Sequence, residues 1–259
     1  MTTALVTGAT AGIGYEFARQ LAERGHDIVL VARDRVRLEN VSDELRRDYK
    51  IRSEVLVADL SDRAQIGKVA QRLAEDARPV DLLVNNAGYG MKKGFLANEI
   101  EAEEAMLDVL CTSVLVLSHA AARAMRTRGR GGIINVSSVA SYASMGTYSA
   151  AKAWVRYFSE GLSRELTGSG VSCMALCPGF THTEFHERGR MNMSRLPEFM
   201  WLDAAAVARQ GLDDAAKGKI VSVPGVQYKT LVGVMNAVPR VLVRDVSSVI
   251  ARRRRTQGS

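Results

Sequence analysis

The sequence predicts a doubly wound α/β fold, in which one parallel sheet of about seven strands carries helices on both faces. Short apolar runs alternate with amphipathic segments of helical period, and turn residues separate the two kinds of segment. A length of 259 residues and a hydrophobic content of 47% suit one large domain with a sizeable core. The expected strands are Thr3–Thr7, Asp27–Ala32, Ser53–Val57, 81–84, 133–136, Val171–Leu176 and 220–223.

Helical segments connect these strands, at 13–24, 34–47, 61–77, 99–127 and 148–166. The longest of them repeats apolar or small side chains with a period of about 3.6 residues. This stripe consists of Leu107, Leu110, Cys111, Val114, Leu117, Ser118, Ala121 and Met125. Regular alternation of strands and helices is typical of a parallel sheet, whose carboxyl edge is where ligands bind in open α/β folds.

The charge is distributed unevenly along the chain. The formal net charge is +7, but seven basic residues and one acid follow position 228, so the first 228 residues carry only +1. A nearly neutral body argues against a nucleic-acid partner. Neither the three cysteines nor His182 and His186 have a metal-binding spacing, so we expect no metal site.

The N-terminus leads directly into the first expected strand, and we see no apolar run that approaches a membrane span. We therefore expect a soluble, cytoplasmic protein.

A glycine-rich turn, Thr7-Gly-Ala-Thr-Ala-Gly-Ile-Gly14, follows the first strand and opens a helix. Glycines there let the backbone approach a pyrophosphate, and the helix N-terminus offers unpaired N–H groups to it. Tight turns also need glycine for their own geometry, so the context of strand before and helix after carries the prediction.

Further polar residues follow the next three strands. Arg33 stands where an acid would bind the ribose of NAD, and an arginine there suits the 2′-phosphate of NADP; the alternative is a solvated charge at a helix start. Asp59 is a candidate for the adenine amino group or for capping the helix near Ser61. Asn85-Asn-Ala-Gly88 is either an ordinary turn or a cofactor contact.

Tyr148 and Lys152 are four residues apart on one expected helix, so their side chains share a face. A free phenol has a pKa of about 10, and a nearby cation lowers that value, which would make Tyr148 a usable acid or base. A chance pair on an amphipathic helix is the alternative. Ser137 and Ser138 end the preceding strand, just upstream of this helix.

Taken in order, the glycine-rich turn, Asn85–Gly88, Ser138, Tyr148-x-x-x-Lys152 and Pro178-Gly179 resemble the short-chain dehydrogenase/reductase family, in its single-domain NAD(P)-dependent branch. The resemblance covers roughly residues 3 to 225. It implies a Rossmann-type sheet, with NADP(H) favoured over NAD(H) by Arg33.

The resemblance also assigns roles. Tyr148 would be the acid/base, Lys152 would lower its pKa and hold the nicotinamide ribose, and Ser138 would bind the substrate oxygen. The implied cofactor contacts are Gly8, Thr10, Ala11, Gly12, Ile13 and Gly14 for the pyrophosphate, Arg33 for the 2′-phosphate, Asp59 and Leu60 for the adenine, Asn86, Ala87 and Gly88 for the adenosine ribose, and Pro178, Gly179, Thr181 and Thr183 for the nicotinamide, with Tyr148 and Lys152.

Two features depart from the family pattern. Leu110 stands where an asparagine usually holds a water of a proton relay, although it also fits plain packing on the helix stripe. The loop from Ser138 to Tyr148 is shorter than usual, which leaves Ser137 as a second candidate for the catalytic serine.

The segment from about 184 to 205 is expected to form a substrate lid and is rich in methionine and aromatic residues. Adaptable side chains of this kind suit a lipophilic ketone or alcohol, such as a steroid or acyl ketone. The alternative is that they pack the lid onto the core.

Beyond a catalytic domain at 1–227, residues 228–259 form a basic extension with an apolar helical pattern at 228–237 and a second one at 241–250. Its arginines, Arg252 to Arg255, favour either weak contact with a membrane surface or a solvated helix end. Alternatively, its apolar stripe covers the lid or a partner subunit.

We therefore expect an NADPH-preferring carbonyl reductase or alcohol dehydrogenase, assembled as a homodimer or homotetramer. The main alternative is a catalytically weak NADP-binding sensor or scaffold, suggested by Leu110 and the short loop.

Overall fold

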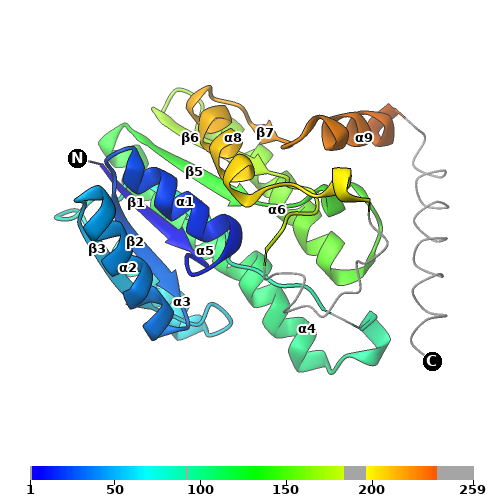
Figure 1. Ribbon diagram of the computed structural model, residues 1–259, viewed down its shortest axis with the longest axis horizontal. Coiled ribbons are helices and arrows are strands. Elements are labelled where there is room, and N and C mark those ends of the chain that lie inside the picture. The colour runs from blue at the N-terminus through cyan, green and yellow to red at the C-terminus, as the bar shows by residue number, and fades with distance from the viewer. Residues whose placement is uncertain (1, 92, 184–196, 238–259) are drawn as a thin grey trace.

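One parallel sheet of seven strands forms the centre of the molecule, in the order β3-β2-β1-β4-β5-β6-β7 (Figure 1). The computed structural model describes residues 2–91, 93–183 and 197–237. The strands are β1 (Thr3–Thr7), β2 (Asp27–Ala32), β3 (Ser53–Val57), β4 (Leu82–Asn85), β5 (Gly131–Val136), β6 (Val171–Leu176) and β7 (Val221–Ser222). The predicted doubly wound α/β fold is confirmed.

The strand order reverses beside β1. The chain builds outward from β1 to β2 and β3, then returns to place β4 against the other side of β1, where Val6 pairs with Val84. Connections that leave in opposite directions open a crevice at the carboxyl ends of β1 and β4. The glycine-rich turn and Asn85–Gly88 both lie at this switch point.

Helices cover both faces of the sheet (Figure 1). They are α1 (Gly12–Glu23), α2 (Arg35–Tyr49), α3 (Arg63–Leu73), α4 (Ile100–Leu107), α5 (Ser113–Arg128), α6 (Gly146–Glu165), α8 (Ala204–Ala216) and α9 (Val226–Ala237). Phe17, Leu38 and Val207 bring α1, α2 and α8 into one core cluster, whereas Ile66 and Leu117 bring α3 and α5 into another. Short 3₁₀ turns are η1 (Phe95–Ala97), η3 (Val139–Tyr142) and η4 (Glu198–Met200).

The long helix predicted at 99–127 is interrupted by a π-helical turn, η2 (Asp108–Thr112), between α4 and α5. Such turns widen a helix locally and often lie at functional sites. Of the predicted stripe, Leu107 is wrong as a core residue, because 37% of it is exposed, whereas Leu110, Leu117 and Met125 are fully buried.

The interrupted helix also overturns the expectation that no apolar segment is long enough to cross a membrane. Ile100–Arg128 has 29 residues, and its most apolar window of 18 residues has a mean hydropathy of 1.7, which meets the length and composition of a span. Half of its most apolar window is buried, and α5 packs against α3 and β5. It is therefore a core helix of the domain.

Several element boundaries differ from the sequence prediction. Helix α3 ends at Leu73 rather than near 77, and α6 begins at Gly146, two residues before Tyr148. Helix α8 was not among the predicted helices. The predicted segments 184–196 and 238–259, with the Arg252–Arg255 cluster, lie outside the described residues.

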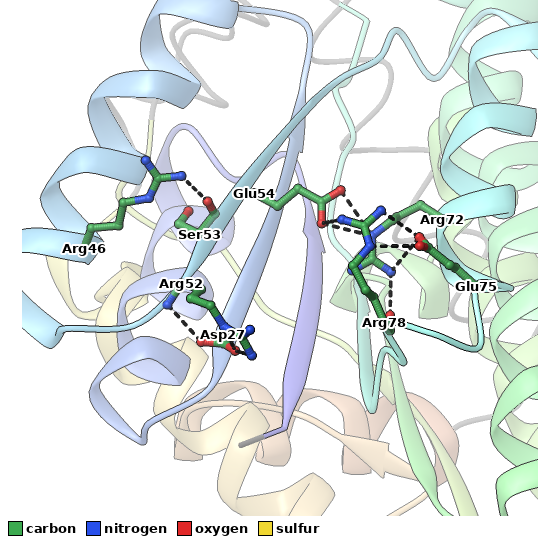
Figure 2. Close-up of polar contacts among 8 residues, drawn as sticks. All are labelled: Asp27, Arg46, Arg52, Ser53, Glu54, Arg72, Glu75 and Arg78. Atoms are coloured by element: carbon green, nitrogen blue, oxygen red, sulfur yellow. Dashed lines mark hydrogen bonds and ion pairs between the residues drawn. The ribbon is translucent and has the colours of Figure 1, made fainter.

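The amino edge of the sheet carries a set of ion pairs (Figure 2). Asp27 at the start of β2 binds Arg52, and Glu54 at the start of β3 binds Arg72 and Arg78. Because all strands are parallel, their first residues gather at this edge, and helix α3 ends beside them. These charges therefore lie at the opposite edge of the sheet from the glycine-rich turn.

Candidate active site

The residues that the sequence singled out lie in the turns that follow β1, β2, β3, β4, β5 and β6, or at the start of α6. In a parallel sheet these turns share the carboxyl edge. The structure thus brings the predicted cofactor and catalytic residues to one edge.

In the turn between β1 and α1, the backbone of Gly14 lies close to that of Gly8. A methyl group on Gly14 would lie 2.2 Å from the Gly8 carbonyl oxygen, so only glycine fits there. Ala11 caps α1 without a side-chain hydrogen bond, which leaves the N–H groups of the first turn, Gly12 to Gly14, for a ligand. This arrangement fits a pyrophosphate at the positive end of a helix.

Thr7 and Asn86 hold this turn against the end of β4. The Asn86 amide donates to the carbonyl oxygens of Thr7, at 3.0 Å, and Gly8, at 3.3 Å. The Thr7 hydroxyl accepts from the backbone N–H groups of Asn86 and Ala87. The Asn86 side chain therefore shapes the turn. Thr7 is a positioning residue that sequence reasoning missed, although its place at the end of a buried strand, directly before Gly8, was a usable signal.

Arg33 and Asp59 follow β2 and β3 and form a loose ion pair, with 3.7 Å between Nη1 and Oδ2. Arg33 is 68% exposed, so its guanidinium is accessible to an anion. Burial raises the pKa of Asp59, but hydrogen bonds from Ser61 and the charge of Arg33 outweigh it, and the net shift is downward.

The predicted cap role of Asp59 is wrong. Asp62 caps α3, accepting from the N–H groups of Ala64 and Gln65, whereas Asp59 accepts from the Ser61 N–H and hydroxyl in a separate turn. Leu60, the other residue predicted at the adenine, is buried beside it. Asp34, next to Arg33, caps α2.

Ser138, Tyr148 and Lys152 meet where β5 ends and α6 begins. The Ser138 hydroxyl neighbours the Tyr148 phenol and acts to lower its pKa. Lys152 Nζ lies 5.9 Å from the centre of the Tyr148 ring and donates to the Val136 carbonyl at 2.8 Å. A serine, a tyrosine and a lysine are thus assembled from two elements.

The two candidate serines are separated by their contacts. The Ser137 hydroxyl is buried and donates to the Lys152 carbonyl at 2.6 Å, so it braces α6. The Ser138 hydroxyl, by contrast, acts on Tyr148 and lowers the pKa of its phenol against the effect of burial. The short loop before Tyr148, which contains η3, therefore leaves Ser138 in position.

Burial acts on the two titratable groups in opposite directions. It raises the pKa of Tyr148 to about 12, although the neighbouring Ser138 hydroxyl opposes the rise. It lowers the pKa of Lys152 to about 8, although the neighbouring Cys111 and Cys177 thiols oppose the fall. The expectation that Lys152 lowers the Tyr148 pKa below its ordinary value is not met, because desolvation is the larger effect here.

Leu110 forms an apolar wall beside these groups. It is fully buried in a cluster with Met106 and Ala151, against which Tyr89, Met91, Cys111 and Tyr148 pack. A methyl group on Gly88 would lie 2.8 Å from Leu110 Cδ2 and 3.6 Å from Lys152 Nζ, so leucine and lysine border the same spot. The packing role predicted for Leu110 is confirmed.

The segment after β6 completes the edge. The Pro178 carbonyl accepts from the N–H of Val139, which directly follows Ser138, at 3.0 Å. Thr181 bridges to Leu202, and the Thr183 methyl group packs at Gly12, where an added carbon would lie 2.8 Å away. Within residues 2–91, 93–183 and 197–237 no group of three or more His, Cys, Asp or Glu side chains could hold a metal ion.

Of the predicted lid, residues 197–205 are described. The His182 ring stacks on Trp201 at 4.6 Å and Phe180 lies 6.0 Å from Trp201, so part of the aromatic content packs on the segment after β6. Phe199 is 70% exposed. Within the described part of the predicted lid, Phe199 is therefore an aromatic side chain that is not buried by packing on the core.

Comparison with known proteins agrees with this geometry. Residues 2–193 match the family model described as short chain dehydrogenase. An NADP-dependent 3-hydroxy acid dehydrogenase of Salmonella typhi is 38% identical over 189 residues, which cover 70% of this chain and 73% of that protein.

Two solved structures extend the similarity to the whole fold. A short-chain dehydrogenase from Sphingobium yanoikuyae, in complex with NADPH, is 35% identical with a TM-score of 0.84 and covers 92% of this chain and 94% of that one. A bulky-bulky ketone specific alcohol dehydrogenase from Comamonas testosteroni is 31% identical with a TM-score of 0.79, covering 92% and 95%.

Proposed function

Because this chain belongs to the short-chain dehydrogenase family and is an NAD(P)-dependent oxidoreductase acting on hydroxy or keto groups, we propose that it reduces lipophilic ketones with NADPH, with Tyr148 as the proton donor. One observation carries the proposal. Ser138 and Tyr148 adjoin a buried lysine, Lys152, at the same sheet edge as the glycine-rich turn.

The chemistry of these side chains fits ketone reduction. With a pKa of about 12, Tyr148 holds its proton at neutral pH and can give it to a substrate oxygen. Ser138 would donate a hydrogen bond to the same oxygen. Lys152 is charged below about pH 8 and would stabilise negative charge that develops on the tyrosine and the substrate oxygen.

The cofactor cradle supports a dinucleotide. The close approach at Gly14 and the uncapped start of α1 fit a pyrophosphate, and Arg33 with its exposed guanidinium fits a 2′-phosphate. Lys152 and Tyr148 would hold the nicotinamide ribose, and Thr181 and Thr183 would border the nicotinamide. When bound, the nicotinamide supplies the hydride. The NADP-dependent relative and the NADPH complex favour the phosphorylated form.

The apolar wall supports the substrate class. Leu110, Met91 and Tyr89 surround the Tyr148 side with carbon-rich groups, which reward burial of an apolar substrate. The relative with a bulky ketone preference has the same fold over nearly its whole length.

The test is NADPH oxidation, followed by absorbance, against ketones graded by size and polarity. We expect bulky apolar ketones to turn over fastest, and the Tyr148→Phe variant to lose about 10²–10⁴-fold in rate. Tyr142→Phe, which changes a tyrosine six residues away that stacks on Arg156, is the matched control. NADPH binding without turnover of any ketone would favour the sensor alternative, and equal turnover of small polar ketones would contradict the substrate class.

We also propose that the chain forms a homodimer or homotetramer through α5 and α6. Both helices present large apolar side chains to solvent, namely Leu115, Trp154 and Tyr157, and Trp154 stacks on Phe158 at 4.9 Å. Exposed aromatic groups of this kind are typical of interfaces. Light scattering should show an oligomer for the wild type and a smaller species for Trp154→Glu. A monomeric wild type would contradict this proposal.

A further inference from the structure

We infer that Tyr228, on α9, is a positioning residue for the nicotinamide side of the cofactor site, an inference that rests on the proposed function. Tyr228 belongs to the predicted C-terminal extension, yet only 1% of it is exposed. Its hydroxyl accepts from the Phe180 N–H at 3.1 Å and donates to the Met200 carbonyl at 2.6 Å. One phenol therefore binds the backbone of Phe180, which follows β6, and that of Met200, in η4.

The ring of Tyr228 fixes the same segment from a second direction. A methyl group on Gly179 would lie 2.1 Å from two ring carbons of Tyr228, so the ring rests directly on the glycine backbone. Glycine at 179 and tyrosine at 228 therefore fit as a pair. The segment between Pro178 and Phe180 is held by a hydrogen bond and by van der Waals contact at once.

This contact is connected to the catalytic groups by short steps. Pro178 precedes the held glycine, and its carbonyl accepts from Val139, the residue after Ser138, at 3.0 Å. On the other side, Phe180 leads into Thr181, which bridges to Leu202. Helix α9 also packs on η3, the turn that follows Ser138. Tyr228 thus positions the segment proposed to border the nicotinamide and supports the serine loop.

The adenosine half of the proposed site is built on other elements than the nicotinamide half. Arg33 and Asp59 lie after β2 and β3, on the far side of the switch point from β6 and α9. Tyr228, in contrast, hydrogen-bonds to Phe180 and Met200 and packs its ring on Gly179. A loss of its hydroxyl should therefore weaken ligands that reach the nicotinamide site and spare ligands that fill only the adenosine site.

The experiment titrates two probes into the full chain: NADPH, followed by its fluorescence, and adenosine 2′,5′-bisphosphate, followed by calorimetry. For Tyr228→Phe we expect the Kd of NADPH to rise about tenfold, as for one lost buried hydrogen bond, with the Kd of the bisphosphate unchanged. Thr230→Val, which removes an exposed hydroxyl from the same helix, should change neither.

A second variant approaches the contact from its other side. Gly179→Ala places a methyl group against the Tyr228 ring and should show the same selective loss, which keeps the test informative if Tyr228→Phe does not fold. Unchanged NADPH binding in both variants, or an equal loss for both probes in folded protein, would overturn the inference. A wild-type protein that binds neither probe would overturn the proposed function together with it.

Discussion

The two edges of the sheet each bury a cation, and they treat it differently. At the amino edge Arg72, 8% exposed, binds Glu54 at 3.0 Å, donates to the Arg78 carbonyl at 2.7 Å and lies near Glu75 (Figure 2). At the carboxyl edge Lys152, 4% exposed, donates to the Val136 carbonyl, and no described carboxylate pairs with it. The fold neutralises charge where it serves stability and leaves it uncompensated where chemistry is proposed.

Two ion pairs made by exposed arginines repeat the contrast. Asp27 and Arg52 at the amino edge are 2.7 Å apart, with backbone and side-chain hydrogen bonds between them, whereas Arg33 and Asp59 at the carboxyl edge are 3.7 Å apart. A loose pair yields its arginine to a phosphate at little cost, because exposed pairs contribute little stability. Of these two pairs, the looser one lies at the edge where we propose that the cofactor binds.

The largest effect should come from Lys152→Met. Activity should fall about a hundredfold or more, because the charge beside Tyr148 is lost. Stability at pH 7 should rise by about 2–3 kcal/mol, because a group whose pKa burial lowers from 10.5 to about 8 no longer has to be buried charged. Chemical denaturation and turnover measure the two quantities. A variant less stable than the wild type would show that burial of the Lys152 charge is not costly in the folded protein.

Arg72→Met should have the opposite signature. We expect a loss of about 2–3 kcal/mol of stability, since Glu54 and the Arg78 carbonyl lose a buried donor, with turnover per folded molecule unchanged. Arg78→Met, which removes the more exposed partner of the same cluster, should cost less. An activity loss in folded Arg72→Met would contradict the view that the amino edge contributes to stability and not to catalysis.

The pH dependence of stability and of turnover tests the role proposed for Lys152. Its folded pKa, about 8, lies below the ordinary 10.5, so between these values the unfolded chain binds more protons. Stability should therefore rise with pH through this window, and Lys152→Met should lack this rise. The rate of ketone reduction should fall as pH passes about 8. A stability curve identical in wild type and variant would refute the lysine's assignment.

The smallest effect concerns Arg33. Arg33→Ala should raise the KM for NADPH about tenfold, as for one charge-assisted contact, and leave the KM for NADH unchanged. Arg47→Ala, at the far end of α2, is the matched control, since its partner there is Asp48. Equal changes for both cofactors would show that Arg33 does not select the phosphate.

Much of the fold and of the site's location followed from local pattern. Strands β1, β2, β3 and β6 have the predicted bounds, because each is a short apolar run whose ends are marked by turn residues. The predictions that were wrong concern which of several nearby side chains makes a given contact. Asp59 was the residue considered as the cap of the helix near Ser61, but α3 begins at Arg63 and Asp62, which the sequence analysis did not single out, caps it.

The alternation of strands and helices, the glycine-rich turn, and the shared helical face of Tyr148 and Lys152 could be predicted from local sequence, since each depends on residues within a few positions of one another. The proximity of Ser138 to Tyr148, the opposite effects of burial on the pKa values of Tyr148 and Lys152, and the packing of Tyr228 on Gly179 could not. Desolvation and close packing are set by segments far apart in the chain, and their magnitudes exceed those of local contacts.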